Sequence, residues 1–338
     1  MNLEDVAQRA GVSTATVSRV LNDIGVVRKA TRTKVLKAVE ELKYSPNLHA
    51  RALAGGGRTI GMVVSNLENP FFLDIFHSLD IGAQQQGYEV LIANTGYDQA
   101  RLKRSVRMML GRRPSGMALI VSEIENSLLD EISEHGIRAV AYDADGPRKG
   151  ITNIRTNYRR GMQRIAEYLY SLGHRHMAYV GHHSGLGPLN DRRQAFEEVL
   201  QAYAPQVQYR LVANDDSFQG GRQAVRDLFD QGFQPTAILC VNDYMALGVL
   251  RQLRDLGLRV PEDVSVSGFD NISLADVASP ALTTAHIPRE QIGRLILDNL
   301  IGDGKDKAAT EVVIEPELVV RESTGIAKQN HYPNRARQ

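Results

Sequence analysis

Two short apolar repeats separated by a glycine, within residues 3–22 (LEDVAQRAGVSTATVSRVLN), constrain this chain most. In the first repeat apolar residues recur at helical spacing, and Gly11 then ends the pattern. Ser13 is a residue type that caps a following helix, in which apolar residues again recur at helical spacing. Two short helices joined by a tight turn are typical of a helix-turn-helix, whose second helix enters the DNA major groove. An ordinary helical hairpin has the same spacing, so this pattern alone leaves both interpretations open.

A third amphipathic segment at residues 30–42 predicts a helix that closes a three-helix headpiece. We expect four of its apolar residues to turn inward: Val35, Leu36, Val39 and Leu42. The sequence then breaks at residues 44–47, and residues 48–54 (LHARALA) form a short helical candidate before three glycines. A helix this short is not stable alone in water, so the segment needs DNA or a second copy of itself to become ordered.

Charge is distributed unevenly along the 338-residue chain. Residues 1–58 hold ten Lys and Arg against five Asp and Glu, a net charge of +5, although the whole chain carries only +1. A basic head on an acidic body is typical of a nucleic-acid-binding protein with a second module of another kind. A solvated basic surface gives the same count, so charge alone does not decide between the two interpretations.

Two features indicate the compartment. Cys240 is the single cysteine, so no internal disulfide can form and a reducing compartment is favoured. The first residues lack the basic start and apolar run of a signal peptide, and no stretch approaches the length of a transmembrane helix. We therefore expect a cytoplasmic protein that does not contact a membrane.

From residue 59 onward the pattern changes to apolar strands that alternate with amphipathic helices. Such alternation predicts parallel sheets covered by helices on both faces, and its two runs predict two lobes. The expected strands are 60–65, 88–94, 116–121, 138–143, 176–181, 209–213, 236–241 and 263–268. The expected helices are 71–87, 98–112, 124–135, 188–203, 219–231 and 244–256. In sheets of this kind ligands bind at the carboxyl ends of the strands, so the residues that follow each strand carry the functional information.

The residues after several predicted strands are aromatic, acidic or amide side chains. They include Asn69, Phe71, Phe72, Asp143, Asn242, Phe269 and Asp270, with Arg192 at the start of a helix that follows another strand. Aromatic faces combined with carboxylate, amide and guanidinium groups are how a cleft holds a polyhydroxylated ligand. Each Asp or Asn could instead only cap the next helix, but the same chemistry at four strand ends favours a binding site.

Nearly all of the chain resembles the LacI/GalR (lactose-repressor) family of bacterial transcription factors, which implies a nucleoid-associated protein. The resemblance rests on DVAQRAGVSTATVSRVLN, TRTKV, YSPN with ARALA, SLGHRHMAYVG, NDYMALGVL, SVSGFDN, LTT and LVVRES, in that order. It implies an all-α helix-turn-helix headpiece followed by a two-lobed α/β effector domain like that of periplasmic binding proteins. It also implies a homodimer or tetramer that binds pseudo-palindromic operator DNA, most simply as a repressor. A small molecule, often a sugar, would control this binding.

The resemblance assigns roles to residues of both modules. Thr14, Ala15 and Arg19 would read bases, because arginine can form bidentate bonds with guanine. Ser13, Thr16, Ser18 and Asn22 would touch phosphates, Asn47 would also contact DNA, and Leu53 would enter the minor groove beside its dimer mate. The implied effector-binding residues are Asn69, Phe71, Phe72, Asp143, Arg192, Asn242, Phe269, Asp270 and His286.

Three positions depart from the family pattern. Arg28 stands where a serine usually precedes the third helix, which puts that cap in doubt. Asp216 stands where an aromatic ring often closes over a sugar, and Ile287 replaces a common glutamine. We therefore expect an effector that is more polar than a plain hexose, or of a different shape.

The expected domains are a headpiece at 1–46, a hinge helix and linker at 47–58, an effector-binding and dimerisation domain at 59–330, and a tail at 331–338. The two lobes would comprise 59–157 with 288–320, and 158–287. Without a long heptad tail, a dimer is the default. We expect no cofactor beyond the small-molecule effector.

Three other functions would require sequence features that can be compared with this chain. A solute-binding transport component, or a cytoplasmic sugar-binding protein with another role, would not need the basic headpiece. A sugar-converting enzyme would need a nucleophile and base pair, and none is evident, so we expect no enzyme activity. Four histidines, at 174, 176, 182 and 183, lie close in sequence, but without a cysteine or carboxylate nearby they do not favour a metal site.

Overall fold

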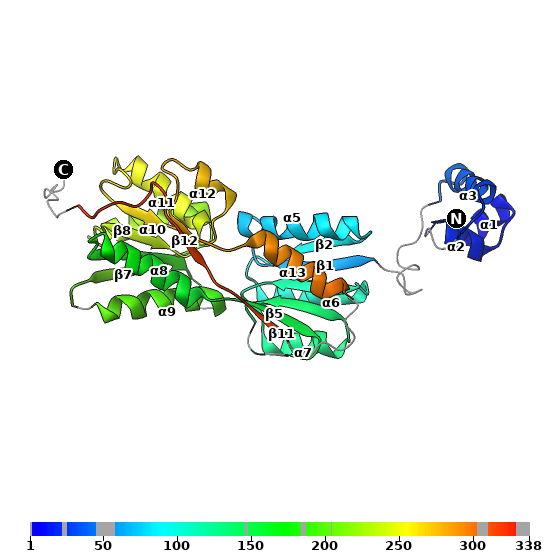
Figure 1. Cartoon of the computed structure of the whole chain (residues 1–338), viewed down its shortest axis with the longest axis horizontal. Coiled ribbons are helices and arrows are strands. Elements are labelled where there is room, and N and C mark those ends of the chain that lie inside the picture. Colours follow the sequence, from blue (N-terminus) through cyan, green and yellow to red (C-terminus); the bar gives the residue numbers. More distant parts are fainter. Residues whose placement is uncertain are drawn as a thin grey trace. The chain divides into compact units, whose positions relative to one another are not determined.

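The computed structural model describes residues 2–21, 26–44, 58–144, 146, 148–183, 187–203, 205–302 and 310–328. The chain divides into two compact units, Met1–Gly57 and Arg58–Gln338 (Figure 1). The predicted hinge helix, together with Asn22, Asn47 and Leu53, lies outside the described residues.

The headpiece consists of α1 (Leu3–Ala10), α2 (Thr14–Leu21) and α3 (Lys29–Glu41). Asn2 and Asp5 form a reciprocal capping box at the start of α1. Gly11 ends α1 in the left-handed conformation, with φ of 66°, which a residue without Cβ adopts at little cost. The predicted helix pair and its glycine turn are therefore confirmed.

The core of the headpiece corrects one prediction about α3. The buried residues are Val6, Ala7, Val17, Val20, Val35 and Ala38, whereas Leu36, which was expected to face inward, is 48% exposed. Leu36 lies about 100° around the helix from Val35, while Ala38 and Val39 return to the Val35 face. Ala38 therefore takes the core position that the sequence pattern predicted for Leu36.

The first lobe of the larger unit is a six-stranded parallel sheet in the order β11-β5-β4-β3-β1-β2. Its strands are β1 (Thr59–Val64), β2 (Glu89–Asn94), β3 (Gly116–Ile120), β4 (Arg138–Tyr142), β5 (Ile151–Thr156) and β11 (Thr310–Ile314). Its helices are α5 (Pro70–Gln85), α6 (Gln99–Gly111), α7 (Asn126–Glu134) and α13 (Arg289–Ile301). α5 and α13 cover one face of the sheet, and α6 and α7 pack with the core of the other face.

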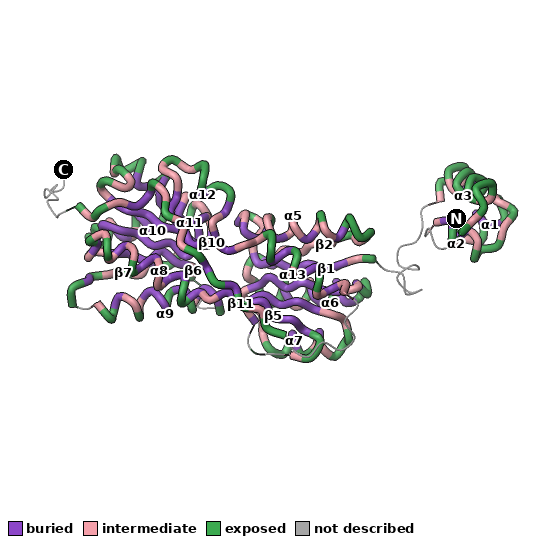
Figure 2. Tube along the Cα trace, in the orientation of Figure 1, coloured by how far each residue is buried: buried purple, intermediate pink, exposed green. Residues whose placement is uncertain are grey.

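The second lobe is a four-stranded parallel sheet in the order β7-β6-β8-β9. Its strands are β6 (His176–His182), β7 (Gln208–Asn214), β8 (Ala237–Cys240) and β9 (Ser265–Ser267). α8 (Tyr158–Ser171) packs against α9 (Gly187–Ala202), and α10 (Phe218–Asp230) packs against α11 (Asp243–Asp255). α12 (Ser273–Val277) is one short turn. Figure 2 shows the buried strands inside these helical layers, and Cys240 lies among them.

The C-terminal part of the chain returns to the first lobe and then to the second. We expected the first lobe to extend to residue 320. α13 and β11 belong to the first lobe, but β12 (Glu317–Val319) pairs antiparallel with β10 (Thr284–His286). Beyond β12 the backbone stays with the second lobe, where Val266 N–H donates to the Ser323 carbonyl and Ala327 N–H to that of Leu172. The return to the first lobe therefore ends near Ile314.

Among the described residues, every helix is too short or too polar to cross a membrane. The predicted architecture, a helix-turn-helix headpiece and a two-lobed α/β domain with parallel sheets, is confirmed.

Candidate functional site

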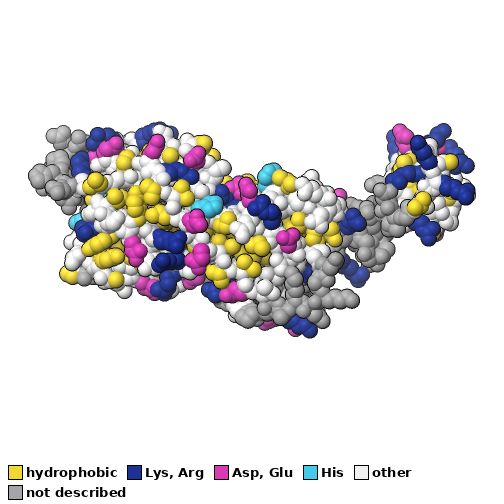
Figure 3. Space-filling view, in the orientation of Figure 1, with side chains coloured by type: hydrophobic (Ala, Val, Ile, Leu, Met, Phe, Trp, Pro, Cys, Tyr) yellow, Lys and Arg dark blue, Asp and Glu magenta, His cyan; other side chains and the backbone are white. Residues whose placement is uncertain are grey.

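The exposed face of α2 carries the residues that the sequence assigned to DNA. Ser13 Oγ accepts a hydrogen bond from Thr16 N–H at 3.2 Å, so Ser13 holds the start of the helix. Ser13, Thr14, Ala15 and Arg19 are exposed, and Thr16 and Ser18 are half-buried. Figure 3 shows Lys and Arg side chains spread over the headpiece, as a protein that binds a phosphate backbone requires.

Arg28 precedes α3 and makes no side-chain cap bond, as its departure from the family pattern led us to expect. The first turn of α3 therefore keeps backbone N–H groups without a side-chain cap.

A cavity between the two lobes brings together residues from the carboxyl ends of strands in both sheets. Its volume is about 30 Å³, which holds a water or two and no larger molecule. It is lined by Asn69, Phe71, Phe72, Tyr97, Ile120, Val121, Ser122, Tyr142, Tyr158, Pro188, Leu189, Arg192, Asp216, Asn242 and Asp270. Parallel sheets put their strand ends at one edge, so two facing sheets converge on a single site.

Two asparagines of this cavity also cap helices. Asn69 Oδ1 accepts from Phe71 N–H at 3.1 Å at the start of α5, and Asn242 Oδ1 accepts from Met245 N–H at 2.9 Å at the start of α11. Capping fixes each side chain at the cavity wall, so the capping role and a binding role do not exclude each other.

Aromatic rings form one wall of the cavity. Phe71 meets Phe72 edge to face at 5.4 Å between ring centroids, and Tyr142 lies 6.0 Å from Phe71. Phe269 is fully buried beside Tyr158, with ring centroids 5.8 Å apart. Phe269 supports the lining from behind and is not itself part of it.

Arg192 on α9 is the one cationic side chain among the described residues that line the cavity. Its guanidinium lies 4.2 Å above the Tyr158 ring centroid and 4.9 Å from that of Phe269. It donates to the Val241 carbonyl at 2.9 Å and lies 3.7 Å from Asp270 Oδ1. Arg192 Nε and Asp270 Oδ1 are nevertheless buried without a hydrogen-bond partner among the described residues.

Two carboxyl groups near Arg192 are held in unusual environments. Asp143 and Asp270 adopt left-handed backbone conformations, with φ of 57° and 105°. Burial raises the pKa of each carboxyl to about 7, although hydrogen bonds from Tyr158 and from Thr156 N–H oppose this for Asp143, and Arg192 and Arg289 oppose it for Asp270. Both groups therefore change charge near neutral pH.

Asp216 connects the two lobes. Its Oδ2 accepts from Tyr97 Oη at 2.5 Å and from Asn66 Nδ2 at 3.2 Å, and its Oδ1 accepts from Asn242 Nδ2 at 2.6 Å. Tyr97 and Asn66 follow strands of the first lobe, whereas Asp216 and Asn242 follow strands of the second. A carboxylate thus stands where the resemblance led us to look for an aromatic ring.

The structure does not bring His286 into the cavity. It lies half-buried on β10, where its Nδ1 is 3.0 Å from Asn271 Nδ2, and burial lowers the pKa of its imidazole. The histidine cluster has a structural explanation too, since buried His174 contacts Thr236 Oγ1 and the Gly325 carbonyl, each at 3.0 Å.

Three tyrosines of the cavity were not predicted from the sequence: Tyr97, Tyr142 and Tyr158. Tyr97 follows β2 and Tyr142 ends β4, so the rule of strand ends could have found both. Tyr158 begins α8, an element that the sequence pattern did not predict.

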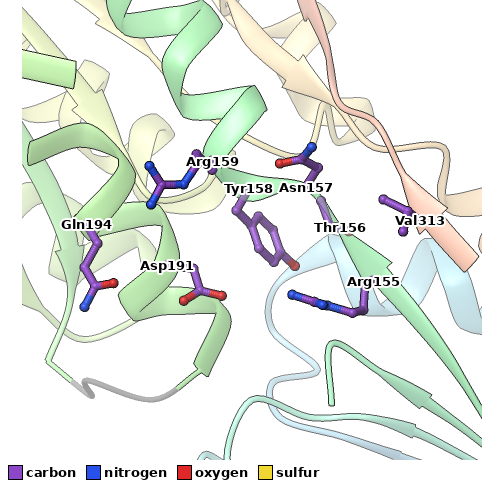
Figure 4. Close-up of a pocket in the computed structure, with 8 residues that line it drawn as sticks. All are labelled: Arg155, Thr156, Asn157, Tyr158, Arg159, Asp191, Gln194 and Val313. Atoms are coloured by element: carbon purple, nitrogen blue, oxygen red, sulfur yellow. The ribbon is translucent and has the colours of Figure 1, made fainter. Parts of the chain in front are cut away.

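A second, open groove has a volume of about 420 Å³. Figure 4 shows Arg155, Asn157 and Arg159 from the β5–α8 junction opposite Asp191 and Gln194 of α9, with Tyr158 between them. Tyr158 lines both this groove and the inner cavity.

Comparisons with known proteins agree with this architecture. Residues 2–47 match the family described as "Bacterial regulatory proteins, lacI family", and residues 166–324 match a "Periplasmic binding protein-like domain". The chain is 34% identical over 332 residues to the HTH-type transcriptional repressor PurR of Vibrio vulnificus (strain CMCP6), covering 95% of this chain and 98% of that protein.

Two solved structures are similar over the same length. The Lac repressor dimer bound to operator and the anti-inducer ONPF is 28% identical, with a TM-score of 0.79 and coverage of 96% of this chain and 99% of that one. The transcriptional regulator CelR in complex with cellobiose is 29% identical, with a TM-score of 0.65 and the same coverage. From its headpiece, its two lobes and its identity to a repressor along nearly its whole length, we conclude that the chain belongs to the LacI family and is a DNA-binding transcriptional repressor, not an enzyme.

Proposed function

We propose that a small polar effector, a sugar or sugar derivative, binds between the lobes and controls this repressor. One observation carries the proposal: Arg192 Nε, a donor, and Asp270 Oδ1, an acceptor, are buried together without hydrogen-bond partners in the described part of the chain. Buried polar atoms are costly unless something bonds to them. A hydroxyl group both donates and accepts, so adjacent hydroxyls of a polyol would satisfy both atoms.

The rest of the cavity supports the same ligand class. Phe71, Phe72 and Tyr142 offer ring surfaces to the C–H faces of a sugar, while amides and carboxylates surround them. CelR, which shares the fold over the whole chain, is described with cellobiose bound. The cavity of about 30 Å³ is smaller than any sugar, so the lobes must separate or Arg192 must move for an effector to enter.

On the DNA side, we propose that two copies of the chain bind a pseudo-palindromic operator. Arg19, Thr14 and Ala15 would read bases, Ser13, Thr16, Ser18 and Asn22 would contact phosphates, and Asn47 and Leu53 would act at the operator centre. The Lac repressor is described as a dimer on its operator. Exposed apolar side chains on the larger unit suit a body contact between copies: Leu73, Ile81, Leu274 and Val277. A tetramer would need a further interface.

The experiment is a thermal-shift screen of sugars, sugar acids and polyols, followed by operator titration with and without each compound that raises the melting temperature. Binding stabilises the folded state by mass action, so a true effector raises the melting temperature and changes operator affinity. A compound that shifts melting but leaves operator affinity unchanged would favour the alternative, a sugar-binding protein with another role. If no compound does either, the proposed ligand class is wrong.

A further inference from the structure

Among the described residues that line the cavity, Asp216 is the only one whose carboxylate accepts hydrogen bonds from side chains of both lobes. Besides its two carboxylate oxygens, its carbonyl accepts from Asn66 Nδ2 at 2.9 Å. Its side chain is therefore fixed in position at the junction of the lobes, where it lines the cavity.

The hydrogen bonds that Asp216 accepts leave one acceptor site open. An ionised carboxylate offers about four lone-pair sites. Three are used, one on Oδ1 by Asn242 and two on Oδ2 by Tyr97 and Asn66. The remaining site is on Oδ1, and only a hydrogen-bond donor can fill it.

The side chains bonded to Asp216 have most of their donor hydrogens already in use. Tyr97 has a single hydroxyl hydrogen, which it gives to Asp216, and burial and the charge of Asp216 raise the pKa of Tyr97 so that it keeps that hydrogen. Asn242 donates one of its two amide hydrogens to Asp216, while its oxygen accepts from Met245 N–H. A ligand at this end of the cavity thus meets the negative charge of Asp216 and its open acceptor site, together with one remaining amide hydrogen of Asn242.

We propose that Asp216 selects the charge of the effector: the closed cleft takes a molecule that turns a hydroxyl or ammonium group toward Asp216, and rejects one that turns a carboxylate or phosphate toward it. This inference rests on the proposed function, because it narrows the effector of the same cavity. Like charges a few ångströms apart in a partly desolvated site repel strongly, and Arg192, the cation of the cavity, lies beside Asp270.

The test uses matched sugars that differ at one group. Glucose, galactose and mannose, their 2-amino-2-deoxy forms and their uronates are screened by thermal shift on the full chain, and binders are measured by calorimetry. We expect neutral or amino forms to bind wild type at least about tenfold more tightly than the matching uronates. Asp216→Asn keeps the shape but removes the charge, and should reduce that ratio at least about threefold.

Two further variants distinguish the charge of Asp216 from two other effects: the loss of a contact between the lobes, and the loss of any nearby negative charge. Tyr97→Phe removes one contact between lobes but leaves the carboxylate, so the preference against uronates should persist. Asp215→Asn removes a neighbouring carboxylate whose side chain is 82% exposed, and should leave the ratio unchanged.

A failure of the role of Asp216 and a failure of the proposed ligand class would give different results. Uronates that bind wild type as tightly as neutral sugars would overturn the role of Asp216 while supporting a sugar effector. That role would also be overturned if the ratio stayed unchanged in Asp216→Asn, or fell equally in Asp215→Asn. A panel in which nothing shifts wild type would overturn the proposed ligand class, and the inference with it.

Discussion

Arg192 and Asp270 lie 3.7 Å apart between the lobes, buried, yet they do not complete each other's hydrogen bonds. A well-formed buried pair would satisfy both groups and close the cavity permanently. Here one donor and one acceptor remain open, and the pKa of Asp270 is raised to about 7 by burial despite the nearby cation. The pair is thus arranged to receive a third group.

The raised pKa values of Asp143 and Asp270 predict how stability depends on pH. Both carboxyls ionise near pH 7 when folded and near 3.8 when unfolded, so between those values the folded chain holds more protons. The contribution of these two groups to stability is then fully present below the unfolded pKa and is lost as pH rises through 7. We expect these two groups to lower the free energy of unfolding, measured with urea without effector, by on the order of 5 kcal/mol between pH 5 and pH 8.

Asp270→Asn checks the source of this pH dependence. The variant should flatten the slope and abolish the thermal shift given by the effector, whereas the exposed Asp215→Asn should change neither. An unchanged slope in Asp270→Asn would mean that other groups titrate.

Effector binding should show the opposite sign. Ionised Asp270 is the better acceptor for a hydroxyl, so effector affinity should rise from pH 6 to pH 8, approaching tenfold as protonated Asp270 loses its proton. Calorimetry of a neutral sugar, whose own charge does not change over this range, measures it. Affinity that stays constant with pH would exclude a contact with ionised Asp270.

Arg19→Ala should weaken binding to the operator by about 1–3 kcal/mol and to random DNA only slightly, because an exposed arginine on α2 can bond two edges of a guanine. Lys34→Ala on α3 is the matched control, since an exposed lysine acts through charge and should weaken both DNAs similarly. Fluorescence anisotropy at fixed salt gives both values. Equal losses in Arg19→Ala would assign Arg19 to phosphate contact.

Neighbouring residues of α3 should differ in their effect on headpiece stability. Val35 is fully buried, so Val35→Ala should destabilise the headpiece by about 1–3 kcal/mol. Leu36 is half exposed, and Leu36→Ala should change stability by less than about 0.5 kcal/mol. Amide hydrogen exchange of α1 to α3 in the full chain measures both. A larger loss in Leu36→Ala would mean that Leu36 packs inward, as the sequence alone suggested.

Periodicity and strand ends were enough to predict most of the fold and six of the fifteen residues that line the cavity. Asn69, Asn242 and Asp270 follow strands, and the rule that ligands bind at strand ends places them without any tertiary information. The partners of Asp216 could not be predicted in the same way. Tyr97 and Asn66 meet it only because two lobes face each other, which no local pattern records.

The sequence pattern did not predict β5 or α8, at residues 151–171, and the composition of β5 explains why the strand was missed. β5 is buried except at Arg155, but four of the six residues in its sequence ITNIRT are polar. The polar groups find partners inside the fold: Thr152 bonds Asn299, Asn153 bonds the Ala144 carbonyl, and Thr156 bonds Tyr142. Buried polar residues that are fully bonded do not interrupt a strand, although they interrupt its apolar pattern.

Gly161→Ala should distort the support beneath Arg192. A Cβ at position 161 would lie 2.7 Å from Phe269 Cζ and 3.0 Å from Pro316 Cβ, closer than such atoms approach. Phe269 must shift, and because its ring lies under the Arg192 guanidinium, the shift should move Arg192 as well. We expect a loss of about 1–3 kcal/mol in stability and weaker effector binding. Gly111→Ala, where a Cβ meets nothing within 4 Å, is the control.

Tyr158→Phe tests the junction between the two lobes. Tyr158 Oη donates to Asp143, which leaves Asp143 with that bond and one from Thr156 N–H at 2.6 Å. Without the hydroxyl the pKa of Asp143 should rise further, because the bond from Tyr158 opposes the effect of burial. The ring remains, so the stacking of Arg192 is kept. The fall of stability with pH should therefore extend to a higher pH in Tyr158→Phe than in wild type, and Asp143→Asn should remove the difference between the two. Urea unfolding from pH 5 to pH 9 of the two single variants and the double variant measures this. If Tyr158→Phe shifts the profile equally with and without Asp143, the hydroxyl acts elsewhere and the assigned bond does not control the titration.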